Sequence, residues 1–577
     1  MPAADQPSSS AWPVESALSR PDGFAQAPRD LHWIEKNVPC QAACPAGTDI
    51  PAYLEAIARE DYAEAYTINL RDNVFPAVLG RVCTRPCEPA CRHGWEGLGE
   101  PVAICFAKRS ADDFMIRKGP VVLEPVFPSS GKSVAVVGGG AAGLTLAREL
   151  ALWGHEVKVY DRHERPGGLM EQGIPEFRLP REVLRREVEQ IQLAGVQFIC
   201  GVDVGVDVTL ESLRAAHDAV VVAAGTTRPS TPDLPGVDLI GVEHGLAFLR
   251  AINRGQTPEP PGRVVVIGGG FTAVDCARVG QRLGASDVCM MYRRSADEMY
   301  VTQVELQAFA EEGVRVEFLA TPVAFEGEKG RVSAVRMIRT RLVPGSDARA
   351  ACEPVPGSEF SVPADLVLLG TGQVREDGWL CEETGDDLFL AGDFVNGPES
   401  LIDAIGHGKQ VARRVDHYLM GADRFEEGIL IENVKTTTTG RTLEMDKRLR
   451  SSMPELTREQ RGLRAEVETG LGKPSAVLEA ERCYLCNYKF EIDNDLCIYC
   501  DRCLKVMPVD NCIVKASALI FDEQDRITGH MPSTSSRDYN MLYLDQNECT
   551  RCGACVEVCP VECITLQKVT RVTRPAE

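Results

Sequence analysis

The 577-residue chain lacks the features of a membrane or secreted protein. No apolar run approaches the roughly 18 residues that a membrane-spanning helix needs. The start, MPAADQPSSSAWPVES, has neither the basic residues nor the apolar stretch of a secretory signal. Basic residues are also in deficit, with 62 Lys and Arg against 84 Asp and Glu, and a net charge of −22 argues against nucleic acid or an anionic membrane as partner. We therefore expect a cytoplasmic protein with no membrane span.

Cysteine, in contrast, is abundant and unevenly placed. Of 22 cysteines, six lie between positions 40 and 105 and eleven between 483 and 563. The other five are expected to be small buried apolar side chains: Cys200, Cys276, Cys289, Cys352 and Cys381. A disulfide framework is not expected without a secretion signal, so the two terminal groups, which have ligand spacings, predict bound metal.

A first dinucleotide-binding unit begins in SVAVVGGGAAGLTLARELALWGHEVKVYD. We expect a strand over 133–137, a helix from about 141 to 153 and a second strand over 157–160 that ends at Asp161. Gly138, Gly140 and Gly143 form G-x-G-x-x-G between them, which permits a tight turn and close approach to a pyrophosphate at a helix N-terminus. Asp161 is placed to accept hydrogen bonds from ribose hydroxyls.

The unit recurs in RVVVIGGGFTAVDCARVGQRLGASDVCMMYRR. After a strand over 264–267, Gly268, Gly270 and Ala273 form the fingerprint, with Ala in its third position. The second strand, 288–292, is followed by Arg293 and Arg294 instead of an acid. Guanidinium groups suit a 2′-phosphate, which predicts NADP(H) at this second site. The alternative is a basic strand end that only contacts solvent.

Two such folds, the second inserted within the first, predict a flavin reductase with FAD in the first and the nicotinamide in the second. Further strand-and-turn segments agree with this, namely 218–226, 365–373 and 388–393, and residues 403–408 are placed to begin a helix. Neither fold contains C-x-x-C, so the dithiol that a disulfide reductase needs beside its flavin is missing. Electrons should therefore leave through metal.

These residues resemble a known family over about positions 32–420. The order of a Cys-rich start, an FAD fold and an inserted NADPH fold resembles the small subunit of bacterial glutamate synthase. It is similar too to the N-terminal half of dihydropyrimidine dehydrogenase and to the large subunit of NADH-dependent ferredoxin:NADP oxidoreductase. The motifs that carry the resemblance are CPAGTDIPAYL (44–54), GRVCTRPCEPAC (80–91), GGL (167–169), GIPEFRLP (173–180), GGGFTAVDCAR (268–278) and AGD (391–393).

The resemblance implies contacts to both cofactors. For FAD it implies Val82, Gly140, Ala141, Ala142, Gly143, Leu144, Asp161 to Leu169 with Gly168, Arg178, Val204, Ala224, Gly225, Gly392, Asp393 and Ala404. For NADPH it implies Gly270, Thr272, Ala273, Arg293, Arg294 and the turn from Gly370 to Gly372 and Gln373. Phe271 departs from the family, which usually has Asn or Asp there. No catalytic residue is assigned, because hydride transfer needs no side-chain acid or base.

The N-terminal cysteines depart further from the family. Relatives with two clusters carry two more cysteines, whose places here fall at about His32 and Glu35, and a ligand of some relatives falls at Lys108. We expect one [4Fe–4S] cluster on Cys44, Cys83 and Cys87, with the fourth ligand from Cys40, Cys91 or Cys105. A second cluster, or a purely structural region, are the alternatives.

The C-terminal cysteines include two ferredoxin signatures, CIYCDRC and CTRCGACVEVCP. The second is C-x₂-C-x₂-C-x₃-C-P, in which three thiolates bind one cubane and the fourth binds the other. The expected sets are Cys497, Cys500, Cys503 and Cys559 for one cluster, and Cys549, Cys552 and Cys555 for the next.

The fourth ligand of that second ferredoxin cluster is the open question. It would lie near Met507, which replaces the usual Cys. Cys512, or the pair Cys483 and Cys486, could replace it, and otherwise the cluster is three-iron or labile. Simple packing is the alternative for Cys512 and Cys563. We expect Cys483 and Cys486 to bind a metal whose kind the spacing does not define.

The predicted fold is an α/β core of two nested Rossmann-like domains, preceded by a helical Fe–S domain and followed by a ferredoxin-like α+β domain. The expected boundaries are 1–30, disordered leader; 31–128, helical Fe–S domain; 129–255 and 365–425, FAD domain; 256–364, NAD(P)H domain; 426–480, linker; and 481–577, ferredoxin-type domain.

The predicted function is electron transfer between NADP(H) and a one-electron carrier through FAD and two to four [4Fe–4S] clusters. We expect a hetero-oligomer, in which the chain serves ferredoxin or a ferredoxin-dependent subunit such as that of a 2-oxoacid oxidoreductase. The alternatives are a glutamate synthase small subunit and a non-catalytic electron conduit. The physiological direction and electron bifurcation are not encoded in any motif.

Overall fold

The computed structural model describes residues 30–576 apart from 96–98, 117–118, 257, 300, 302, 345–349, 381–384, 435–439, 524–526, 534–540 and 547. Residues 1–29 of the predicted leader, and Cys381, lie outside the described residues. The chain divides into two compact units. We call residues 127–399 and 455–469 the dinucleotide unit, and residues 1–126, 400–454 and 470–577 the cysteine-rich unit.

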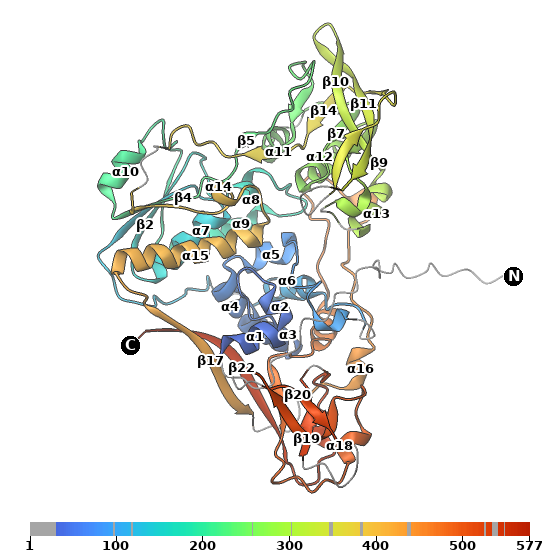
Figure 1. The fold of residues 1–577 in the computed structure, drawn as a ribbon. Coiled ribbons are helices and arrows are strands. Elements are labelled where there is room, and N and C mark those ends of the chain that lie inside the picture. The colour runs from blue at the N-terminus through green and yellow to red at the C-terminus, as the bar shows by residue number, and fades with distance from the viewer. Residues whose placement is uncertain are drawn as a thin grey trace, which may run out of the picture. The chain divides into compact units, whose positions relative to one another are not determined.

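The dinucleotide unit contains a first parallel sheet, in the order β16 (Leu388–Leu390), β4 (Ala219–Val222), β1 (Ser133–Val137), β2 (Glu156–Asp161) and β3 (Gln197–Cys200) (Figure 1). The strand predicted over 133–137 is present with those bounds. α7 (Ala141–Leu152) follows β1, and α9 (Arg181–Leu193) packs against α7. Nearly every side chain of β1 and β4 is buried, as expected for strands covered on both faces.

A second parallel sheet has the order β6 (Val242–His244), β14 (Leu366–Leu369), β7 (Arg263–Ile267), β8 (Asp287–Tyr292) and β9 (Val314–Phe318). α11 (Gly245–Asn253), α12 (Phe271–Arg282) and α13 (Gln303–Glu312) accompany it. β6 and β14 lie just outside the span 256–364 that we predicted for this domain, yet they pair within its sheet.

Shorter elements complete the dinucleotide unit. An antiparallel sheet joins β10 (Ala320–Glu328), β11 (Arg331–Val343), β12 (Ala351–Pro354) and β13 (Phe360–Pro363). β5 (Arg228–Pro229) pairs with β15 (Gln373–Val374). The remaining helices are α8 (Leu169–Gln172), α10 (Leu210–Ala216) and α14 (Asp393–Asn396), with 3₁₀ turns at Ala296–Glu298 and Arg458–Gln460.

The cysteine-rich unit begins with helices α1 (Leu31–Asn37), α2 (Pro39–Ala42), α3 (Ile50–Ala58), α4 (Tyr62–Asn73), α5 (Pro76–Val82) and α6 (Ile104–Phe114). The carboxylates of Asp49 and Asp61 cap α3 and α4 by accepting from backbone amides three residues on. α15 (Leu401–Met420) contacts α4 and α5. None of the described helices combines the length and apolarity of a membrane span.

The C-terminal part of this unit is built from antiparallel strands. β18 (Tyr488–Ile492), β22 (Ile564–Pro575) and β17 (Phe425–Val434) form one sheet, and β20 (Ile527–Pro532), β19 (Ile513–Phe521) and β21 (Met541–Leu544) form another. α18 (Arg502–Lys505) contacts α19 (Ala554–Glu557). β17 lies in the segment that we expected to be a linker, of which α16 (Leu443–Asp446) is also part. These elements share one hydrophobic core with the N-terminal helices.

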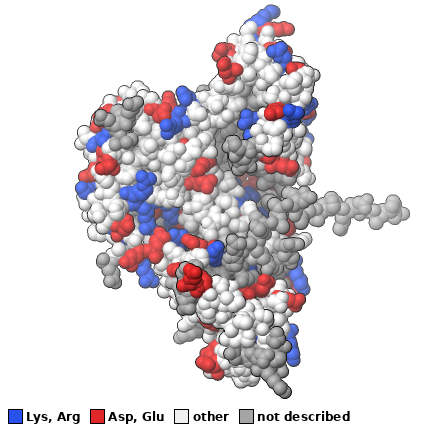
Figure 2. Space-filling view, in the orientation of Figure 1, with Lys and Arg blue, Asp and Glu red and all other residues white. Residues whose placement is uncertain are grey.

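On the described surface that Figure 2 shows, acidic and basic side chains are interspersed. The excess of 22 negative charges is therefore not gathered into one area of that face.

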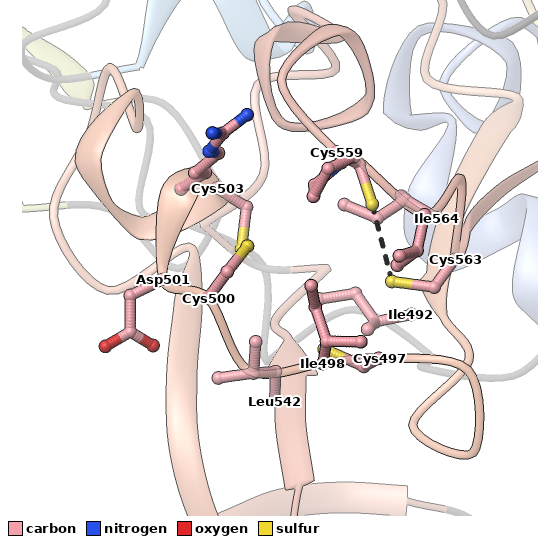
Figure 3. A pocket seen from close by; sticks show the side chains of 13 residues that line it. Ile492, Cys497, Ile498, Cys500, Asp501, Cys503, Leu542, Cys559, Cys563 and Ile564 are labelled. Atoms are coloured by element: carbon pink, nitrogen blue, oxygen red, sulfur yellow. Dashed lines mark hydrogen bonds between the residues drawn. The ribbon is translucent and has the colours of Figure 1, made fainter.

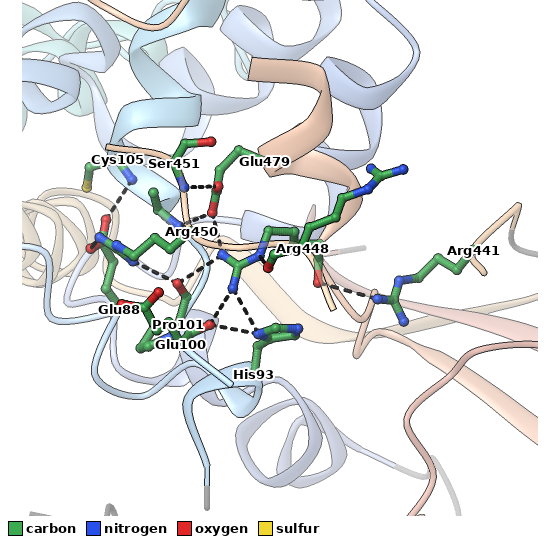
Figure 4. Close-up of polar contacts among 12 residues, drawn as sticks. Glu88, His93, Glu100, Pro101, Cys105, Arg441, Arg448, Arg450, Ser451 and Glu479 are labelled. Atoms are coloured by element: carbon green, nitrogen blue, oxygen red, sulfur yellow. Dashed lines mark hydrogen bonds and ion pairs between the residues drawn. The ribbon is translucent and has the colours of Figure 1, made fainter. Parts of the chain in front are cut away.

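A buried ionic network fastens α17 (Lys473–Glu481) to the N-terminal helices (Figure 4). Glu479 and Arg482 are paired at 2.7 Å and are 0% and 1% exposed. Glu479 Oε1 accepts from the amide of Ala103, and its Oε2 accepts from the amide of Ser451, both at 2.7 Å. Arg482 donates to the carbonyls of residues 100, 101 and 448. The five N–H protons of Arg482 and both carboxylate oxygens of Glu479 thus each find a partner, which a buried ion pair requires.

We predict that Glu479→Ala destabilises the cysteine-rich unit by about 3–5 kcal/mol, because it leaves the Arg482 charge buried without its carboxylate. The matched control is Glu353→Ala, since Glu353 pairs with Arg341 at 2.9 Å on the surface and should cost about 0–1 kcal/mol. Urea unfolding of the full chain, followed by circular dichroism, measures both. Equal losses for the two variants would contradict the role given to this pair.

Candidate functional site

The first fingerprint sits where the carboxyl ends of β1 and β2 meet the N-terminus of α7. Gly138 has φ +105°, and a Cβ there would lie 2.5 Å from the carbonyl oxygen of Ala223. A Cβ on Gly143 would lie 2.0 Å from the carbonyl oxygen of Gly138. Side chains are excluded at both positions, so the loop presents bare backbone to a ligand at the helix N-terminus.

Asp161 lies at the end of β2 and is 7% exposed. Its carboxylate accepts from the amide of Gly139 at 2.7 Å and from the amide of His163 at 2.8 Å. The acid that we expected to meet ribose therefore also fixes the shape of the glycine loop. Each oxygen keeps a lone pair for a further donor.

The other residues implied for FAD within the dinucleotide unit gather around this loop. Gly168 and Gly140 are in close contact, since a Cβ on Gly168 would lie 2.7 Å from the Gly140 Cα atom, and one on Gly392 would lie 2.6 Å from Ala142. These residues occupy the turns, or the first turns of the helices, that follow β1, β2, β3, β4 and β16: Gly140, Ala141, Ala142, Gly143, Leu144, Gly168, Leu169, Val204, Ala224, Gly225, Gly392 and Asp393. Val82 ends α5 and Ala404 lies in α15, both in the cysteine-rich unit.

The loop has features that fit a bound dinucleotide. Gly225 has φ +66°, and a Cβ there would meet no described atom within 4 Å. The next residue, Thr226, is 4% exposed, and its hydroxyl has no partner among the described residues. A buried hydroxyl without a partner is costly, and a polar ligand would satisfy it. Sequence reasoning missed Thr226, although it directly follows the predicted Gly225.

Arg178 is held by the second fold. Its guanidinium donates to Asp275 of α12 at 2.8 Å, and it lies 6.0 Å from the ring centre of Phe271. Phe271, which stands where the family usually has Asn or Asp, thus lies near Arg178, which the resemblance assigns to FAD.

The second fingerprint repeats the geometry after β7. Gly268 has φ +141°, and a Cβ there would lie 2.3 Å from the carbonyl oxygen of Gly370. Ala273 on α12 is fully buried, and Gly270 is the N-cap residue of that helix, with open space where its side chain would be. Thr272 lies in the first turn of α12. Gly372 accepts from the amide of Ser230 at 3.0 Å, and Gln373 pairs with Pro229.

The two arginines after β8 differ in whether the side chain has a hydrogen-bond partner among the described residues. Arg294 donates through Nε to the carbonyl of Ala350 at 2.9 Å. Arg293 is exposed, and its side chain has no partner among the described residues, while its carbonyl accepts from Thr340. Arg293 is therefore the more available cation for a 2′-phosphate.

The described cysteines of the dinucleotide unit form no dithiol. Cys276 on α12 and Cys289 on β8 are both buried. Burial raises the pKa of the Cys276 thiol well above its usual value, and it raises the pKa of Cys289 to about 11. An inert thiol of this kind agrees with the expected packing role.

In the cysteine-rich unit, Cys44, Cys83, Cys87 and Cys105 lie close together. The thiols of Cys83 and Cys87 donate hydrogen bonds to Cys105, which lowers the pKa of Cys105. Burial alone would lower the pKa of Lys108, but the thiolates of Cys105, Cys83, Cys87 and Cys44 raise it. Lys108 is thus a buried cation beside four thiols, and Cys105 occupies the place that we left open for a fourth ligand.

Cys40 and Cys91 lie elsewhere in the same unit. They line a separate pocket together with Cys483 and Cys486. The alternative in which Cys483 and Cys486 join the second ferredoxin set is therefore not the observed arrangement.

One of the ferredoxin sets surrounds a pocket (Figure 3). Cys497, Cys500 and Cys503 line it together with Cys559 and Cys563, and the side chains of Cys497 and Cys563 are hydrogen-bonded to each other. The sulfurs of Cys559 and Cys563 are 3.5 Å apart. The three closely spaced thiols and the distant Cys559 thus meet as the crossing pattern predicts.

The other ferredoxin set gathers around Cys512. Burial, followed by the thiolates of Cys549 and Cys552, raises the pKa of Cys512 to about 12. Burial and the same two thiolates, with that of Cys512, also raise the pKa of Cys555. The Met507 sulfur instead accepts from the amide of Ile513 at 3.2 Å. Cys512 thus lies near the three cysteines of this set, while the Met507 sulfur is already engaged by a backbone amide.

No group of three or more His, Cys, Asp and Glu side chains in the described part of the chain is arranged to hold a single metal ion. Thiolates on one tetrahedral ion are bound at about 2.3 Å and crowd around that point. The ligands of a cubane bind its separate corners and stand farther apart, so groups of four spaced thiols fit a cluster better than an ion.

Three family models match the chain. Residues 132–408 match "Pyridine nucleotide-disulphide oxidoreductase", residues 12–120 match the 4Fe-4S domain II of dihydropyrimidine dehydrogenase, and residues 542–565 match "4Fe-4S binding domain".

Curated relatives agree with these models. The "NADPH-Fe(3+) oxidoreductase subunit beta" of Geobacter sulfurreducens is 34% identical over 519 residues, which are 80% of this chain and 77% of that protein. The "Glutamate synthase [NADPH] small chain" of Mycobacterium tuberculosis is 35% identical over 66% of this chain and 86% of that one. The "NADP(+)-dependent formate dehydrogenase subunit beta" of Moorella thermoacetica is 36% identical over 66% of this chain, but only 60% of that longer protein is covered.

The glycine loops, the grouped thiols and these matches agree on one assignment. The chain belongs to the family of NADPH-dependent iron–sulfur flavoprotein oxidoreductases that includes the glutamate synthase small chains, and it is an oxidoreductase that uses FAD, NADP(H) and [4Fe–4S] clusters.

Proposed function

We propose that the chain moves electrons between NADP(H) and a ferredoxin-type carrier or partner subunit, as the cytoplasmic reductase subunit of a larger complex. The observation that carries this proposal is the shared core of the helical and ferredoxin-like parts, in which thiols gather in groups of four. When bound, FAD would supply the conversion between two-electron hydride transfer and one-electron transfer, and the clusters would supply one-electron transfer.

The side chains of this chain bind and orient both dinucleotides. The loop of Gly138 to Leu144 and the amides of α7 would hold the FAD pyrophosphate, with Asp161 beside its ribose. The loop of Gly268 to Ala273 would hold the nicotinamide dinucleotide, with Arg293 at the 2′-phosphate.

We propose three cluster sites among the cysteine groups. Cys44, Cys83, Cys87 and Cys105 would hold one [4Fe–4S] cluster, with Lys108 as a buried counter-charge. The ferredoxin-like part would hold two more, on Cys497, Cys500, Cys503 and Cys559, and on Cys512, Cys549, Cys552 and Cys555. Val82, an implied FAD contact, directly precedes Cys83, which suggests that electrons enter at that cluster.

The second candidate is a glutamate synthase small chain, as one relative is named. The wider alignment favours the first proposal, since 519 residues align with the NADPH-Fe(3+) oxidoreductase subunit and 426 with the glutamate synthase chain. The partner that we propose is a subunit with one-electron cofactors of its own, such as that of a 2-oxoacid:ferredoxin-type oxidoreductase.

Anaerobic purification of the native complex tests the partner. We expect a stoichiometric subunit that contains iron–sulfur or thiamine diphosphate cofactors and that NADPH reduces through this chain. A glutaminase-type subunit would support the second candidate, and a free chain that reduces added ferredoxin would contradict the hetero-oligomer.

Arg293→Glu should raise the KM for NADPH about tenfold or more and leave that for NADH nearly unchanged. A charge-assisted bond to phosphate contributes about 1.5–3 kcal/mol, and 1.4 kcal/mol is tenfold in affinity. Steady-state kinetics with both nucleotides measures this, with Arg331→Glu as the control for the same charge change on an exposed arginine of the same unit. Equal loss for NADPH and NADH would refute the 2′-phosphate contact.

Cys512→Ala should remove about four iron atoms per chain, or leave a three-iron cluster, because one corner of a cubane loses its thiolate. Met507→Leu should keep the full iron content. Iron and sulfide assays with EPR spectra compare the two variants. If Met507→Leu alone loses iron, the assignment of Cys512 is wrong.

A further inference from the structure

A fourth group of cysteines lies where the two ends of the cysteine-rich unit pack together. Cys40, Cys91, Cys483 and Cys486 line one pocket, whose other walls are mostly apolar side chains such as Ile50. The four cysteines are only 6–9% exposed. Protein interiors are close-packed, and a pocket lined by four thiols offers the soft ligands that an iron–sulfur cluster takes.

The four thiols are near enough to influence one another. Burial raises the pKa of Cys40, and the thiolates of Cys91, Cys486 and Cys483 raise it further. Burial likewise raises the pKa of Cys91 to about 11. Four thiols this close together in one pocket form a ligand set of the kind that a cluster takes.

The backbone at Cys483 independently has the form of a cluster-binding turn. Leu485 has φ +47°, and its amide donates to the Cys483 sulfur at 3.4 Å. Two of the cluster sites proposed above have the same turn. Arg85 and Tyr499 also have positive φ, and their amides donate at 3.4 Å to the sulfurs of Cys83 and Cys497. A non-glycine residue in this conformation costs on the order of 1–3 kcal/mol and recurs where function requires it. Amide bonds to ligand sulfurs are among the groups that set cluster potentials.

The positions at which two-cluster relatives carry further cysteines cannot supply this site. His32 and Glu35 pair with each other at 3.8 Å on the surface of α1, and neither lines the pocket. α17 ends at Glu481, two residues before Cys483, and its buried Glu479–Arg482 pair fixes that end against the loop at Ala103. The C-terminal part thus brings two sulfurs to a place where the N-terminal part has only two.

We propose that Cys40, Cys91, Cys483 and Cys486 hold a [4Fe–4S] cluster that is assembled from both ends of the chain. Its position makes it the link between the cluster of the helical part and those of the ferredoxin-like part.

Three side chains that each interact with two cysteine groups indicate which of the proposed cluster sites are neighbours. Tyr53 is buried, and thiolates of both N-terminal groups raise its pKa, including those of Cys87 and Cys40. Arg92 interacts with both Cys486 and Cys549. Cys503 interacts with Cys512 and Cys555, which connects the two ferredoxin sets. The role as a link rests on the proposed function, whereas the cluster itself does not.

Single and double alanine variants of the full chain test the site. Cys483→Ala and Cys40→Ala should each lose about four iron atoms and the same EPR signal, because either removes a ligand of one cubane. The double variant should lose no more than either single variant. Cys200→Ala is the matched control, a half-buried cysteine of β3 that should keep all its iron. Additive losses, of about eight atoms in the double variant, would overturn a shared cluster, as would full iron in either single variant.

The function of the link has a separate readout. In the Cys483→Ala protein, NADPH should still bleach FAD at the rate of the unaltered chain, while reduction of the C-terminal clusters, followed by freeze-quench EPR, slows at least about tenfold. Unchanged reduction of those clusters would refute the link. If NADPH fails to bleach FAD even in the unaltered chain, the proposed function fails and the iron counts still test the site.

A labelling experiment on the unaltered protein covers the case in which a variant does not fold. During stepwise anaerobic iron removal, Cys40, Cys91, Cys483 and Cys486 should become alkylated together, as one EPR signal disappears. Labelling of Cys483 and Cys486 in a step separate from Cys40 and Cys91 would overturn the proposal.

Discussion

A thiol that binds iron must be a thiolate, and a thiolate is stable inside a protein only beside a compensating positive charge. The cysteine-rich unit buries many of its thiols, and both burial and neighbouring thiolates raise the pKa of Cys40, Cys483 and Cys555. Their surroundings are mostly apolar, apart from a few cations such as Lys108. We infer that the fold of this unit depends on bound iron, which would supply the compensating charge at the proposed cluster sites.

This dependence also explains why the ferredoxin-like part is not a separate domain with its own hydrophobic core. Its strands and the N-terminal helices share one core, and the buried Glu479–Arg482 pair joins them. Since a buried ion pair adds little stability over apolar packing, we infer that the Glu479–Arg482 pair serves to specify one arrangement of the two parts. A strict arrangement is what a cluster with ligands from both parts requires, because each sulfur must meet its own corner of the cubane.

The sequence predicted the features that local chemistry determines. The strand over 133–137, the glycine turns and the ligand spacings follow from steric exclusion at Gly138 and from short-range motifs. Apart from Cys559, which the crossing pattern assigns to the set of Cys497, it did not predict which distant sulfurs meet. Cys105, Cys512 and the pair at 483 and 486 carry no partner information in their spacing, because their partners lie up to several hundred residues away. The strands β6 and β14 were likewise placed outside the nicotinamide domain, since only pairing shows to which sheet a short apolar strand belongs. The positive φ of Leu485 could not be predicted either, because leucine rarely adopts this conformation and only the tertiary structure imposes it.

The central proposal is that this chain holds four clusters and one flavin. Its most direct test is the ratio of iron to FAD in the full chain purified without oxygen, with Mössbauer spectra to identify the iron. The account predicts about sixteen iron atoms per FAD, all in cubanes, four for each site. About twelve or fewer, with the remaining cysteines free to react, would contradict it.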